Sequence, residues 1–129
     1  MDQRLTELRN GLLRLHKTLL DSEQAIYEHD VAKIKSRGQL LGLVMEDPWF
    51  AYLRELSRLV VEIDERQDAE EPATPEETAR FIQQARTLLT PAEEGRGFEK
   101  RYFEALQRDP DVVLAHGAMV RLLSTLREG

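Results

Sequence analysis

The three histidines are the first residues to test for chemistry, because imidazole is a common general base and metal ligand at neutral pH. His16 and His29 lie thirteen positions apart, which turns them about 220° from each other on one helix, so they cannot share an ion. The chain has no His-x-x-x-His pair, no Glu-x-x-His pair and no cysteine. The sequence therefore predicts no metal site.

Nucleophilic catalysis also lacks a recognisable arrangement of residues. The four serines fall in helical patterns, and none lies in a Gly-x-Ser-x-Gly turn. Gly95-Arg96-Gly97 is too short for a phosphate-binding loop, and it follows no strand. We therefore predict no catalytic residue and no cofactor, and we favour a protein without enzymatic activity.

Five side chains combine a ring with a polar atom and could converge inside a helical bundle. These candidate ligand-binding residues are Tyr27, His29, Trp49, Tyr102 and His116. His29 and His116 each continue an apolar stripe, where a lone histidine is more often a hydrogen-bonded core residue than a ligand. Glu23 lies four residues before Tyr27, so the two could touch across one helical turn.

A helical period runs through the beginning of the chain and predicts one long helix, Asp2–Ser36, which Gly38 ends as a C′ residue. Gly11 lies inside this helix and costs about 1 kcal/mol relative to alanine. A kink at Asp21-Ser22 is the alternative to a straight helix. Two apolar seams indicate packing against two neighbours. The first seam is Leu5, Leu8, Leu12, Leu15, Leu19 and Ile26; the second is Leu13, Leu20, Tyr27, Val31 and Ile34.

Proline pairs mark the later helix starts, because an Asp or Thr N-cap accepts a free N–H and a proline at the first helical position lacks one. Gln67–Ala73 has no apolar period and predicts an exposed, mobile loop. The proline pairs are Asp47-Pro48, Thr74-Pro75, Thr90-Pro91 and Asp109-Pro110. The predicted later helices are Gln39–Glu46, Pro48–Asp64, one from Pro75, one regular from about Phe98, and Pro110–Leu126.

No segment has the alternating pattern of a strand, since the β-branched residues lie within helical patterns. The sequence thus predicts an all-α fold, a helical bundle of about five or six helices with one long N-terminal helix. With 129 residues, the chain is expected to form a single domain over residues 1–129.

The charge balance argues against binding to nucleic acid. Acidic residues number 24 and basic residues 18, for a net charge of −6, whereas nucleic-acid binding needs a basic stripe. Lys33, Lys35 and Arg37 are the nearest approach to such a stripe, and we interpret them as a solvated helix end.

The distribution of apolar residues argues against a membrane segment. The longest uncharged runs, Gly38–Met45 and Val112–Val120, are far shorter than the roughly 20 residues that a spanning helix needs. Charged residues also interrupt the N-terminal region, so no signal peptide is predicted. We therefore expect a soluble, cytoplasmic protein.

Three stretches of the chain resemble small bacterial proteins of unassigned function. The resemblance implies a bacterial origin, and it supplies no activity, substrate or catalytic residue. The stretches are Leu15–Leu20 continuing to Tyr27-Glu28, Asp47–Arg54 continuing to Ile63–Glu65, and Arg101-Tyr102 continuing to Leu106–His116.

Two functions fit these observations. The first is a protein-interaction or regulatory module that acts as a homodimer, in which a partner covers the second seam of the long helix. The alternative is a small-ligand-binding protein or enzyme with a pocket between helices. A flat apolar face favours the first, whereas a cavity holding two of the five candidate residues favours the second.

Overall fold

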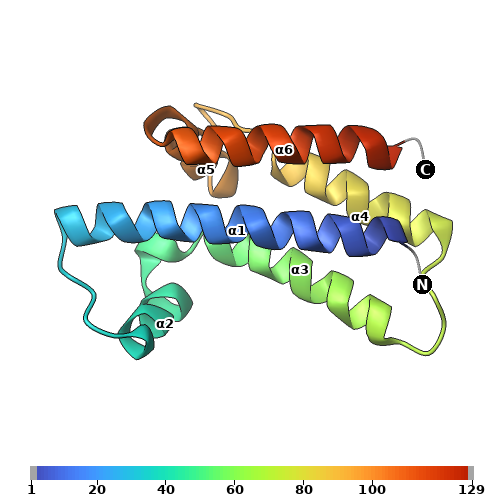
Figure 1. Cartoon of the computed structure of the whole chain (residues 1–129), viewed down its shortest axis with the longest axis horizontal. Coiled ribbons are helices and arrows are strands. Elements are labelled where there is room, and N and C mark those ends of the chain that lie inside the picture. Colours follow the sequence, from blue (N-terminus) through green and yellow to red (C-terminus); the bar gives the residue numbers. More distant parts are fainter. Residues whose placement is uncertain (1–2, 128–129) are drawn as a thin grey trace.

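The computed structural model describes residues 3–127, and helices make up most of them (Figure 1). No strand occurs within this range. The prediction of an all-α fold with a long N-terminal helix is therefore confirmed. The elements are α1 (Gln3–Asp30), α2 (Arg37–Glu46), the short 3₁₀ helix η1 (Pro48–Phe50), α3 (Leu53–Asp68), α4 (Pro75–Leu88), α5 (Phe98–Arg108) and α6 (Pro110–Arg127).

The long helix α1 is the central element. It packs against α3, α4 and α6, and Figure 1 shows α3 on one side of it and α6 on the other. Gly11 lets α6 approach closely, because a Cβ at this position would lie 2.6 Å from Leu122 Cδ2 and 2.9 Å from Met119 Sδ. The chain's own helices therefore cover the first seam, whose buried members are Leu5, Leu8, Leu12, Leu15 and Leu19.

The second seam of α1 is covered less completely. Tyr27 is its only buried member, while Leu20 and Ile34 are half-buried. Leu13 is exposed, and so is Val31, which like Ile34 follows the end of α1 at Asp30. Part of this seam therefore stays open in the single chain.

The first helix ends earlier than predicted, at Asp30 rather than Ser36. The backbone N–H of Ile34 donates to Glu28 Oε2 (3.3 Å), and the side chain of Ser36 accepts from Gln39 N (3.0 Å) to cap α2. These local bonds compete with continuation of the helix. Gly38 accordingly lies in the first turn of α2 and is not a C′ residue, and α1 runs unbroken through Asp21.

Three of the four predicted proline starts are confirmed. Asp47 Oδ1 accepts from Trp49 N (2.8 Å), Thr74 and Glu77 form a capping box, and Asp109 Oδ1 accepts from Asp111 N (2.9 Å). However, the Asp47 cap begins the short helix η1, and α3 starts only at Leu53. The fourth pair, Thr90-Pro91, begins no helix.

The loop predicted at Gln67–Ala73 is shorter than expected, and hydrogen bonds from Arg66 hold it in place. Helix α3 continues through Asp68. The guanidinium of Arg66 donates to the carbonyls of Glu71 (2.9 Å) and Pro72 (3.1 Å) and to Glu77 Oε1 (2.8 Å). The hydrogen bond from Arg66 and the one from the backbone N–H of Thr74 lower the pKa of Glu77 to about 2. A single arginine thus ties the loop to both flanking helices.

No helix within residues 3–127 combines the length and the apolar character needed to cross a lipid bilayer.

Candidate functional site

The structure brings four of the five candidate ligand-binding residues into two pairs. Tyr27 and Trp49 pack edge to face with ring centroids 5.7 Å apart, and the hydroxyl of Tyr102 lies 2.6 Å from His116 Nδ1. His29 lies apart, exposed on the last turn of α1, with Nδ1 2.7 Å from Asp30 Oδ1. His29 is therefore not part of a shared site.

The two pairs belong to two sets of packed rings, which we together call the aromatic array. The guanidinium of Arg101 lies over the rings of Trp49 (5.8 Å) and Tyr52 (4.9 Å) and links the two halves. The indole N–H of Trp49 is buried without an acceptor in the described chain. The contacts of Trp49 within the array are therefore made by the faces and edges of its ring. The array consists of Tyr27, Trp49, Phe50, Tyr52, Phe98, Tyr102 and His116.

A buried carboxylate lies next to the array. Glu23 is fully buried on α1. Its Oε2 accepts from the Tyr52 hydroxyl (2.6 Å) and from Arg108 Nη2 (2.6 Å), and its Oε1 accepts from Arg101 Nη2 (3.3 Å). Arg108 also donates to the hydroxyl of Ser22 (3.2 Å). We call Glu23, Tyr52, Arg101 and Arg108 the Glu23 cluster.

The geometry of the Glu23 cluster is that of an ionised carboxylate. All three partners act as donors, whereas a protonated carboxyl group would need an acceptor. Burial raises the pKa of Tyr52, and the charge of Glu23 and its hydrogen bond raise it further, so the hydroxyl keeps its proton. The arginine side chains remain 31% and 27% exposed, so both cations keep contact with water.

Sequence reasoning missed this cluster, although one signal was present. Glu23 stands four residues after Leu19, where the first seam calls for an apolar side chain. A charge at such a position indicates a buried partner. The partner tyrosine is Tyr52, whereas Tyr27, four residues from Glu23, packs on Trp49 and Phe50 instead.

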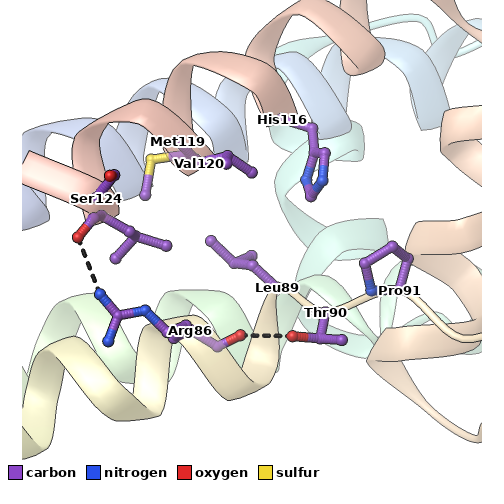
Figure 2. Close-up of a pocket in the computed structure, with 9 residues that line it drawn as sticks. Arg86, Leu89, Thr90, Pro91, His116, Met119, Val120 and Ser124 are labelled. Atoms are coloured by element: carbon purple, nitrogen blue, oxygen red, sulfur yellow. Dashed lines mark hydrogen bonds between the residues drawn. The ribbon is translucent and has the colours of Figure 1, made fainter.

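A hollow of about 350 Å³ lies beside His116, between the end of α4 and α6 (Figure 2). Leu89, Met119 and Leu123 supply apolar walls, and Arg86 also lines it. His116 is the one candidate residue in this lining, with Tyr102 directly behind it. A ligand site was expected to hold two of the five candidate residues, and the lining of this hollow contains one of them.

A second histidine contact links α1 to α3. His16 Nε2 and Ser57 Oγ lie 2.9 Å apart, the spacing of a base and a nucleophile. However, the Ser57 hydroxyl also lies 3.2 Å from the carbonyl of Leu53 in its own helix, and it has only one proton to donate. Because the Ser57 hydroxyl donates its proton to the carbonyl of Leu53, its oxygen accepts a hydrogen bond from His16 Nε2. We therefore interpret the pair as an interhelical hydrogen bond.

Within residues 3–127, no group of three or more histidine, aspartate or glutamate side chains is arranged to hold a metal ion. No protein-family model, curated protein or solved structure matches the chain. The site must therefore be interpreted from its own chemistry.

The Tyr52 bond to Glu23 should contribute more stability than the Tyr102 bond to His116. Tyr52→Phe removes a hydrogen bond to a buried charge and should lower the free energy of unfolding by about 2 kcal/mol. Tyr102→Phe removes the same atom from a neutral pair and should cost about 1 kcal/mol. Urea unfolding followed by circular dichroism measures both. Equal losses of unfolding free energy in the two variants would show that the hydrogen bond to the buried charge of Glu23 is no stronger than the neutral one.

Stability should fall as the pH is lowered from about 7.5 to about 5.5, above the range where most carboxylates titrate. Burial lowers the pKa of both His16 and His116 from 6.5. The unfolded chain therefore binds more protons than the native chain in this range, and the free energy of unfolding decreases. The double variant His16→Asn/His116→Asn should flatten this dependence. A slope that is unchanged in the double variant would contradict the assignment.

Proposed function

We propose that the chain acts as a homodimeric protein-interaction or regulatory module, and that the copies meet through α2. One observation carries this proposal. No residue of α2 is fully buried within the single chain, although five of its ten residues are apolar and two of them, Leu43 and Val44, pack partly against the core. The five apolar residues are Leu40, Leu41, Leu43, Val44 and Met45.

The exposed apolar side chains of α2 form a ridge. Leu41 is 60% exposed and Met45 is 62% exposed, and residues four apart lie on the same face of a helix. Figure 1 shows α2 set off from the rest of the bundle, below one end of α1. An isolated helix of this length is marginal in water, so packing against a partner would stabilise it.

A second copy of α2 is the partner that this helix fits best. Arg37 begins α2 and Glu46 ends it, so an antiparallel pair places each arginine near the glutamate of the other copy. Gly42 has no atom within 4 Å of the place where a Cβ would stand, which leaves room for a close approach. Two-fold dimers are also the commonest soluble assembly.

From the sequence we expected the dimer interface on the second seam of α1, whereas the proposed interface lies on α2. Tyr27 of that seam is buried in the single chain and is not accessible to a partner. Leu13 and Val31 of the second seam remain exposed and can extend the contact. The proposal also includes a cytoplasmic location, supported by the absence of cysteine, and no nucleic-acid partner, supported by the net charge of −6.

Light scattering on a sizing column tests the dimer. At tens of micromolar, the chain should have a mass of about 30 kDa, twice the 14.9 kDa of one copy. Leu41→Glu/Met45→Glu should reduce this mass to that of one copy, because two charges would have to be buried in the interface. Circular dichroism should show that the other helices are retained.

Leu114→Glu is the matched control, because Leu114 is 71% exposed on α6, outside the proposed interface. This variant should remain a dimer. A wild-type mass near 15 kDa would refute the dimer, and loss of the dimer in Leu114→Glu but not in the α2 variant would refute the interface.

A further inference from the structure

The hollow between α4 and α6 has the size and lining of a small-molecule site (Figure 2). Leu89, Met119 and Leu123 give it apolar walls. A cavity of about 150 Å³ is enough to admit benzene, so the 350 Å³ here leaves room for a substituted ring. Val120 and Ser124 on its border are exposed, so the hollow opens to solvent.

His116 presents a neutral polar group to this hollow. The contact with the Tyr102 hydroxyl at Nδ1 orients the ring, and Figure 2 shows it directed toward Leu89 and Pro91. Nε2 has no hydrogen-bond partner in the described part of the chain. Burial lowers the pKa of His116, so at pH 7 the ring offers a hydrogen bond and carries no charge.

Arg86 presents a charged group to the same hollow. Its Nη2 donates to the carbonyl of Leu123 (2.9 Å), which holds the side chain against α6. No carboxylate among residues 3–127 pairs with Arg86. The planar guanidinium keeps further N–H donors in a fork that matches a carboxylate. A half-buried cation beside an apolar wall is therefore complementary to a ligand that joins an apolar body to one negatively charged group.

We propose that this hollow binds a small aromatic carboxylate. The carboxylate accepts hydrogen bonds from Arg86, and the ring lies against Leu89 and Met119. A polar substituent on the ring can reach Nε2 of His116. This site is on a different face from α2 and does not depend on the proposed dimer.

Nuclear magnetic resonance with two matched probes tests the proposal on the whole chain. Benzoate should shift the Met119 methyl and the Arg86 Nε–H signals in a saturable way. Its dissociation constant should be on the order of 1 mM, as expected for a ligand of about nine non-hydrogen atoms. Benzyl alcohol, which keeps the ring and loses the charge, should bind about tenfold more weakly. Equal binding of the two probes, or benzoate shifts scattered over the surface, would overturn the proposal.

Two variants locate the anion partner. Arg86→Gln should abolish the preference for benzoate, because the fork of donors and its charge are lost. Arg80→Gln, at an exposed arginine on the same helix, should leave the preference unchanged. An Arg86→Gln protein that keeps its helicity and still prefers benzoate would refute the assignment. If this variant does not fold, the comparison of the two probes on the wild-type chain decides.

Discussion

The burial of one carboxylate, Glu23, constrains the architecture more than any other interaction. An ion in the protein interior is costly unless donors replace the lost water. Here the three donors come from two separate segments: Tyr52 follows η1, and Arg101 and Arg108 lie near the two ends of α5. Since all of them converge on a single residue of α1, this charge links α5 and the segment after η1 to the central helix.

The rest of the candidate site follows from that anchor. Arg101 donates to Glu23 through Nη2, and its guanidinium lies over the rings of Trp49 and Tyr52. The rings then continue through Phe98 and Tyr102 to His116, which borders the hollow. Helix α2 lies outside this network, and its ties to the bundle include one from Arg54 to the carbonyl of Val44. This difference explains why α2 keeps an open apolar ridge while α5 is buried against its neighbours.

Local rules predicted what depends on neighbours in the chain. The period of leucines located α1, and the caps at Asp47, Thr74 and Asp109 located three helix starts. The contacts of Glu23 were out of reach, because its partners lie 29 to 85 positions away and no spacing rule connects them. His29 and His116 show the same limit. Both continue an apolar stripe, yet packing places His116 half-buried against Tyr102 and leaves His29 exposed to solvent.

A double-mutant cycle on Glu23 and Arg108 tests most directly whether this charge organises the fold. The free energy of unfolding is measured for the wild type, Glu23→Gln, Arg108→Gln and the double variant. With their side-chain atoms 2.6 Å apart, the two residues should show a coupling energy of about 2 kcal/mol or more, because either single change leaves a partner unmatched. A coupling below about 0.5 kcal/mol, as for independent sites, would contradict the account.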